Sequence, residues 1–173
     1  MSQELGSKSE KNGKINNLKV VLFGIGIGVI LTGLIILIAM PKMMITVYQS
    51  RYSTIEETCS KLKESIQAHG WSSPMTRNLN ATLAKNGIEM KRPVRVVELC
   101  KGAYANDILQ TNPEVSTLMP CAWGVYEGND GKIYISGMNM GLMGKMFGGN
   151  IAKIIGGSVA IDEKNMLKDI ILQ

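Results

Sequence analysis

The chain has 173 residues, a formal net charge of +5, 45% hydrophobic residues and 19% charged residues. This composition excludes a disordered chain, and the length suits one small domain that folds without disulfides. Much of the positive charge lies in the first residues, and no basic stripe with interleaved aromatic residues follows. The sequence therefore predicts no nucleic-acid partner.

An uncharged apolar run extends over 21 residues, from Val20 to Met40. A helix of about 20 apolar residues crosses the hydrocarbon core of a bilayer. The run is longer than the apolar region of a cleaved signal peptide, and Ala39-Met40-Pro41 is a poor cleavage site. We therefore expect a polar, disordered tail over residues 1–18 and an uncleaved transmembrane helix over residues 19–41.

The charges that flank this run predict its orientation. Four lysines precede it, namely Lys8, Lys11, Lys14 and Lys19. Positive flanks stay on the cytoplasmic side, so the N-terminus is expected in the cytoplasm. The sequence thus predicts a single-pass protein of the cell inner membrane, with its C-terminal domain extracytoplasmic, in the periplasm.

The first elements after the apolar run are a strand and a helix. Residues 44–50 are rich in β-branched side chains, as in a strand. Ser53 with Glu56 forms a capping-box pattern that predicts the start of a helix, and Gly70 predicts its end. Further along the chain we expect a strand over 73–79, a short helix or loop over 80–86, a strand over 94–100, a short helix over 104–109, and a hairpin of strands 121–127 and 132–136.

The element order lacks the regular alternation of parallel βαβ units. It predicts an α+β domain over residues 43–140, with a mainly antiparallel sheet and helices packed on one face, preceded by one transmembrane helix. Residues 141–173 are expected to form a Gly/Met-rich segment and a C-terminal helix. The apolar stretch 141–161 is expected to be an exposed patch that contacts a partner or the membrane surface. One face of the final helix is predicted to carry Met166, Leu167, Ile170 and Ile171.

Two cysteine-bearing motifs and the segment between them give a family resemblance. The motifs are Val97-Glu98-Leu99-Cys100, then Ala103 and Ala105, then Leu118-Met119-Pro120-Cys121, then Asp130-Gly131-Lys132. This pattern resembles the family called domain of unknown function 302, over about residues 43–140. The resemblance implies an α+β fold with a curved antiparallel sheet, often dimeric, and no established activity. The sequence departs from the family pattern at Lys101-Gly102, where Asn-Pro is common, and at Arg77-Asn78, where some members have a histidine.

Cys100 and Cys121 are the candidate cofactor-binding residues. Cys100 ends a predicted strand where a helix begins, and a helix N-terminus lowers the pKa of a thiol. Cys121 begins a strand that can lie beside it. Three interpretations stay open: two buried core cysteines, a disulfide, or a redox or ligand site for a soft metal or haem iron. The identity of any cofactor is unknown.

Four methionines within nine residues are the candidate metal ligands: Met138, Met140, Met143 and Met146. Thioethers suit Cu(I), but methionine also fills irregular apolar gaps. Cys59 lies on the apolar face of the first domain helix and is expected in the core. His69 is the only histidine and ends that helix, so neither a histidine-rich zinc site nor a Ser/His/Asp triad is supported.

The sequence favours a non-catalytic function over an enzyme. The preferred hypothesis is a single-pass, membrane-anchored extracytoplasmic binding or assembly module, held in the membrane by Val20–Met40. The expected partner is a second copy of the chain or a membrane protein. Gly24, Gly28 and Thr32 form a face of small residues that would suit helix pairing, although glycine is also common in membrane helices. The alternative is a redox, soft-metal or haem-handling protein that uses Cys100 and Cys121.

Overall fold

The structure is a computed structural model that describes the backbone of residues 2–172 and the side chains from residue 21 onward. The chain divides into two compact units, Met1–Lys42 and Met43–Gln173. The described core residues, which begin at Ile55, all lie in the second unit. This second unit is the globular domain.

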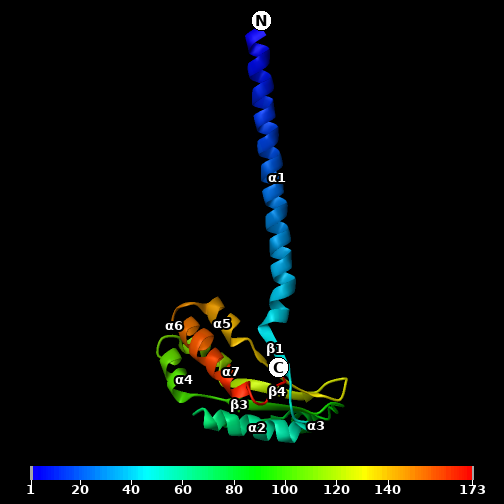
Figure 1. Ribbon diagram of the computed structural model, residues 1–173, viewed down its shortest axis with the longest axis vertical. Helices are drawn as coiled ribbons and strands as arrows, with labels where there is room; N and C mark the ends of the chain where they lie inside the picture. The colour runs from blue at the N-terminus through cyan, green and yellow to red at the C-terminus, as the bar shows by residue number, and fades with distance from the viewer. Residues whose placement is uncertain (1, 173) are drawn as a thin grey trace. The chain divides into compact units, whose positions relative to one another are not determined.

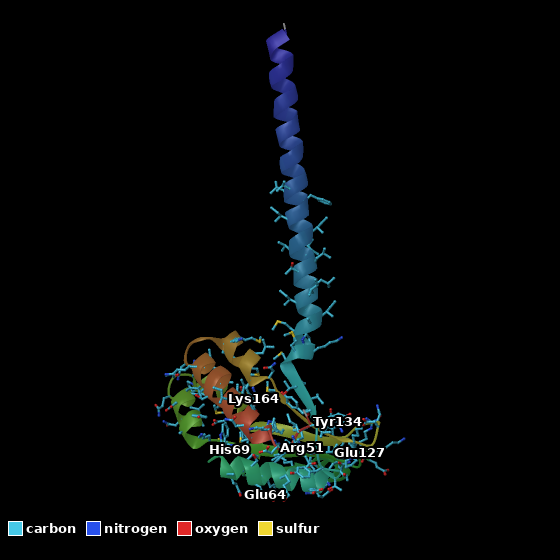
Figure 2. All side chains as sticks on the ribbon, viewed as in Figure 1. Arg51, Glu64, His69, Glu127, Tyr134 and Lys164 are labelled. Atoms are coloured by element: carbon cyan, nitrogen blue, oxygen red, sulfur yellow. The ribbon has the colours of Figure 1, made fainter. Side chains whose placement is uncertain are left out.

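The first helix, α1, runs from Ser2 to Met44. Its stretch Val21–Met44 has a mean hydropathy of 2.8 and is long and apolar enough to cross a membrane. Side chains of this stretch point outward on all sides of the helix (Figure 2). In the structure, α1 begins at Ser2 and so includes residues for which the sequence predicts a disordered tail, over residues 1–18. The polar residues there include good helix formers, and an existing helix extends more easily than a new one starts.

Five antiparallel strands form one sheet in the order β1-β5-β4-β3-β2 (Figure 1). Their bounds are Ile45–Gln49 for β1, Thr76–Asn78 for β2, Val94–Leu99 for β3, Cys121–Glu127 for β4 and Ile133–Met138 for β5. The predicted hairpin is confirmed as β4 and β5, and Gly131 supplies the positive φ of +73° that its turn needs. The α+β fold with an antiparallel sheet is therefore confirmed.

One face of the sheet carries the core. Val97 lies opposite Trp123 in the register of β3 and β4, and both are buried. Their sequence neighbours point to the other face, where Val47 is 50% exposed. Helices α2 (Ile55–Ala68) and α7 (Ala160–Leu167) cover the buried face, since Arg95 reaches Glu56 from that face and Trp123 reaches α7. The expectation that the helices pack on one face is confirmed.

Helix α2 begins one residue later than predicted. The cap is Thr54, whose hydroxyl accepts a hydrogen bond from the Glu57 amide at 3.2 Å. Thr54 and Glu57 have the same capping-box spacing as Ser53 and Glu56. The sequence is therefore compatible with a helix start at either of two adjacent residues. The apolar face of α2 is buried as expected, Cys59 included.

The connections between strands contain short helices. Helix α3 (Leu79–Ala84) precedes β3, while α4 (Gly102–Leu109) and the 3-10 helix η1 (Pro113–Leu118) join β3 to β4. The turn η1 was not expected. Strand β2 is shorter than predicted, because the residues before it include Pro74, which cannot donate to a ladder.

The C-terminal segment forms α5 (Met140–Phe147), α6 (Gly149–Lys153), the π-helical turn η2 (Ile154–Val159) and α7. The expectation of an exposed apolar patch over 141–161 is wrong. Five of its apolar side chains are buried, namely Met143, Ile151, Ile154, Ile155 and Val159. Glycines make this packing close, since a Cβ on Gly144 would lie 2.2 Å from the Gly156 amide nitrogen.

The end of the chain joins the edge of the sheet. The Leu172 amide donates to the Gln49 carbonyl at 2.9 Å, and the Arg51 amide donates to the Ile170 carbonyl at the same distance. The predicted apolar face of the last helix is largely buried, although α7 itself ends at Leu167. Residues 141–172 therefore belong to the same globular domain as the sheet.

Candidate functional site

The sulfur residues predicted from the sequence come together around one small cavity of about 40 Å³. Five of the six proposed site residues line it, namely Cys100, Cys121, Met138, Met140 and Met143. The sixth, Met146, does not line the cavity and is 55% exposed. A cavity of this size could hold an ion or a few waters, but it is too small for a haem.

Cys121 begins β4 opposite Leu99, the last residue of the neighbouring strand β3, and Cys100 directly follows Leu99. Both are free thiols. Burial raises the pKa of the Cys121 thiol to about 12, with smaller contributions from the Glu163 and Cys100 charges. Because the thiolate is the nucleophile and the metal ligand, such a pKa opposes both roles. The redox or soft-metal interpretation stays a prediction.

A second cluster surrounds the carboxylate of Asp162 at the start of α7. Its Oδ2 atom accepts hydrogen bonds from Trp71 Nε1 at 3.0 Å, Lys101 Nζ at 3.0 Å and Tyr104 OH at 3.2 Å. Burial alone would raise the pKa of Asp162, but hydrogen bonds from Lys101, Trp71 and Tyr104 outweigh it and lower the pKa. The cluster holds α7 against α4 and the end of α2. The negative charge of Asp162 is compensated within the cluster by Lys101 and by the two other hydrogen-bond donors.

A larger cavity is a cleft of about 620 Å³ on the helix-covered face of the sheet. We call it the α7 cleft. Strands β1, β4 and β5 and the start of α5 form one side, and α7 and the residue Ile171 form the other. Its lining residues are Thr46, Tyr48, Trp123, Ile135, Gly137, Met138, Asn139, Met140, Gly141, Ala160, Glu163, Lys164, Leu167, Lys168 and Ile171.

Glu163 is the one acidic residue among the described residues that line the α7 cleft. Its Oε1 atom accepts a hydrogen bond from Trp123 Nε1 at 3.3 Å. Burial raises the pKa of Glu163 to about 7, and the Trp123 hydrogen bond offsets this only in part. The carboxyl group can therefore gain or lose a proton near neutral pH, inside a mostly apolar cleft.

Two adjacent acids on α7 thus differ in ionisation state. Asp162 is held as a carboxylate by its donors, whereas Glu163 lies in apolar surroundings that favour the neutral acid. Successive residues of a helix point about 100° apart, which lets Asp162 face α4 while Glu163 faces the cleft. Paired acids whose pKa values are pushed apart are a recurrent feature of functional sites.

Sequence reasoning missed Glu163, Asp162 and Trp123. The string Asp162-Glu163-Lys164 has the composition of a solvated helix face, so it gave no sign of burial. One signal was available: Trp123 stands in the middle of a predicted core strand, and a buried indole N–H needs an acceptor. That argument predicts a polar partner for Trp123, but only the fold identifies it as Glu163.

Comparisons with known proteins agree with this architecture. The sequence profile described as "Domain of unknown function DUF302" matches residues 46–172, and so extends beyond residue 140, where the resemblance was expected to end. The fold is similar to the crystal structure of an uncharacterized conserved protein DUF302 from Bacillus stearothermophilus, with a TM-score of 0.65 and 21% sequence identity. That similarity covers 73% of this chain and 98% of the other. No curated protein matches the sequence.

Proposed function

This chain belongs to the family described as "Domain of unknown function DUF302", and we propose that it is a single-pass, membrane-anchored, extracytoplasmic binding module that holds a small ligand in the α7 cleft. The observation that carries the proposal is the cleft itself. Its volume of about 620 Å³ falls within the range of about 300–1,000 Å³ usual for small-molecule sites. Such sites combine an apolar lining with a few polar groups. In the α7 cleft, the polar groups include the carboxyl group of Glu163 and the indole N–H of Trp123.

A binding role suits the lining better than catalysis does. The residues that line the α7 cleft include no serine, cysteine or histidine. The hydroxyl of Thr46 is already engaged, since it donates to the Gly137 carbonyl at 3.2 Å. The cleft therefore lacks the Ser–His or Cys–His pair that is common in covalent catalysis.

Blocking the cleft is the direct test of binding. Thr46 lines it from β1, and its neighbour Val47 points to the opposite face of the sheet. We expect Thr46→Phe to weaken binding of a neutral apolar probe, phenylnaphthylamine, by about tenfold, because the added ring occupies cleft volume. Val47→Phe adds the same ring on the same strand and is expected to leave the affinity unchanged.

The measurement is fluorescence titration of residues 43–173, with circular dichroism to verify that both variants fold. The isolated domain is a suitable sample, because it contains the described core and because a chain that consists almost entirely of this fold has been crystallised. Probe binding that is absent, or that both variants weaken equally, would exclude the α7 cleft as a binding site.

The membrane anchor and its orientation rest on α1. Apolar side chains along Val21–Met44 are exposed, for example Phe23 at 72% and Leu37 at 73%, and a helix apolar on all sides requires a nonpolar environment. We expect a phosphatase reporter, which is active only outside the cytoplasm, to be active when fused after Gln173. Deleting the four lysines before the run should reduce that activity, because they set the orientation. If a reporter that is active only in the cytoplasm is active after Gln173, the proposed orientation is wrong.

The expected homodimer or membrane-protein partner stays a prediction. The sheet face opposite the helices carries exposed apolar side chains, with Ile45 at 59% and Val47 at 50% exposed.

A further inference from the structure

Charge and apolarity are separated within the α7 cleft. Lys164 lines it from α7, Lys168 lines it from the position directly after the last residue of α7, and both are exposed. The backbone of Lys168 is still helical, and the two lysines are four residues apart, so their side chains leave from the same face (Figure 2 labels Lys164). Among the described residues, neither lysine takes part in an ion pair. The mouth of the cleft therefore presents two positive charges to solvent.

The interior of the cleft is lined mainly by apolar side chains. Trp123 and Ile135 supply its floor from two adjacent strands, and Leu167 supplies its wall from α7. All three side chains are buried. Met138 and Met140 add flexible thioether side chains, which adapt to ligands of irregular shape. This lining suits a hydrocarbon chain rather than a polar solute.

Glu163 lines the cleft directly before Lys164 in the sequence, and it contacts Trp123. Its Oε1 atom is engaged by Trp123, while its Oε2 atom has no hydrogen-bond partner among the described residues. The other titratable groups that line the cleft are Tyr48 from β1, Lys164 from α7 and Lys168 directly after α7. The thiol of Cys121, on β4, is close enough to feel the Glu163 charge.

The cleft is also connected to the apolar helix by a very short piece of chain. Strand β1 begins at the residue that follows Met44, and two cleft residues, Thr46 and Tyr48, lie on β1. An extended residue spans at most about 3.6 Å, so Tyr48 lies within about 15 Å of the end of the helix. If the helix spans a membrane, this wall of the cleft is near the bilayer surface, where single-chain amphiphiles gather.

We propose that the ligand of the α7 cleft is a single-chain anionic amphiphile, such as a fatty acid or a lysophospholipid. This inference rests on the proposed binding function and names its ligand class. The hydrocarbon chain lies over Trp123, Ile135 and Leu167, and the anionic head group binds Lys164 and Lys168. Glu163, when protonated, donates a hydrogen bond to an oxygen of the head group.

Protonation of Glu163 gives the binding a defined pH dependence. The neutral acid is a hydrogen-bond donor, whereas the carboxylate repels an anion. Affinity for the anion should therefore rise as the pH falls from about 8 to about 6. A cationic amphiphile would show the opposite trend.

The test compares ligands that share a chain and differ in the head group. Dodecanoate, dodecanol and dodecylammonium are each titrated against phenylnaphthylamine bound to residues 43–173, at concentrations below those at which they form micelles. The loss of probe fluorescence measures the affinity of each competitor. Acetate serves as the head group without the chain. We expect dodecanoate to bind about tenfold more tightly than either other amphiphile, and acetate to cause no displacement.

Two variants test which charged groups of the cleft bind the head group. Reversal of both rim lysines, in K164E/K168E, should weaken dodecanoate binding about tenfold and leave dodecanol within about twofold. The control K85E/K91E makes the same change of net charge at exposed lysines outside the cleft, and should have no effect. Glu163→Gln should still bind dodecanoate, with an affinity that no longer changes between about pH 6 and about pH 8.

The outcomes separate this inference from the proposed function. If the neutral probe binds but dodecylammonium or dodecanol equals dodecanoate, the ligand class is wrong and the binding function stands. If acetate competes as well as dodecanoate, the cleft takes a small anion and the amphiphile is excluded. If no probe or amphiphile binds, both proposals fail together.

Discussion

Replacing Glu163 by glutamine is expected to stabilise the domain at alkaline pH. Burial raises the pKa of this carboxyl from its ordinary value of 4.5 to about 7. A raised carboxyl pKa means that the folded state binds the proton more tightly than the unfolded state does. The stability linked to this group is therefore fully present below about pH 4.5 and is lost as the pH rises through about 7.

The size of the effect follows from the same change. At about 1.4 kcal/mol for each pH unit, ionisation of Glu163 costs the folded domain up to about 3 kcal/mol at pH 8. Glutamine carries no charge and can still accept the hydrogen bond from Trp123 through its amide oxygen. We expect E163Q to exceed the parent by about 2–3 kcal/mol in unfolding free energy at pH 8, and to match it near pH 4.5.

Urea unfolding of residues 43–173 across this pH range is the measurement. The control is Glu127→Gln, because Glu127 is exposed at the end of β4 (Figure 2). It removes the same charge from the surface and should leave the pH dependence of the parent in place. A parent domain as stable at pH 8 as at pH 5 would show that Glu163 is ionised throughout, and that its surroundings are wetter than the cleft suggests.

Sequence periodicity predicted the elements whose packing is local. The hairpin of β4 and β5 was predicted because a glycine-rich turn separates two alternating runs, and α2 because its apolar residues recur at helical spacing. The position of the α2 cap was wrong by one residue because Thr54 repeats the chemistry of Ser53. Such errors concern the boundaries of elements and not their existence.

The site depended on contacts between distant parts of the chain. Trp123 and Glu163 are separated by 40 residues, and no local pattern links them. The same holds for Trp71 and Asp162, which are separated by 91 residues. By contrast, the sulfur residues were found individually from their chemistry, and the fold brings five of them to one cavity.

The C-terminal segment shows why composition alone misled. A stretch rich in glycine and apolar residues, with few charges, is typical of an exposed adhesive patch. Here the glycines let two helical segments approach until their backbones touch, and this contact buries the apolar residues around it. Whether glycine means flexibility or close packing is decided by the partner segment, and sequence patterns do not identify that partner.

This close contact leads to the second large expected effect. A Cβ at residue 144 would lie 2.2 Å from the Gly156 nitrogen and 2.4 Å from its Cα. Both atoms are backbone, so a side-chain rotation cannot relieve the clash, and α5 must move away from η2. Overpacking of this kind costs about 1–3 kcal/mol, and more where the backbone itself has to shift. We expect Gly144→Ala to lower the free energy of unfolding by at least about 3 kcal/mol.

Gly157 provides the matched control, because it lies in the same π-helical turn and a Cβ there would meet nothing within 4 Å. Gly157→Ala should leave stability unchanged or raise it by up to about 1 kcal/mol, since alanine restricts the unfolded chain. Thermal and urea unfolding of the two variants gives the comparison. Equal stabilities would mean that α5 and η2 are not in backbone contact. A large loss confined to Gly144→Ala is the expected result, because only that substitution places a side chain between the two backbones.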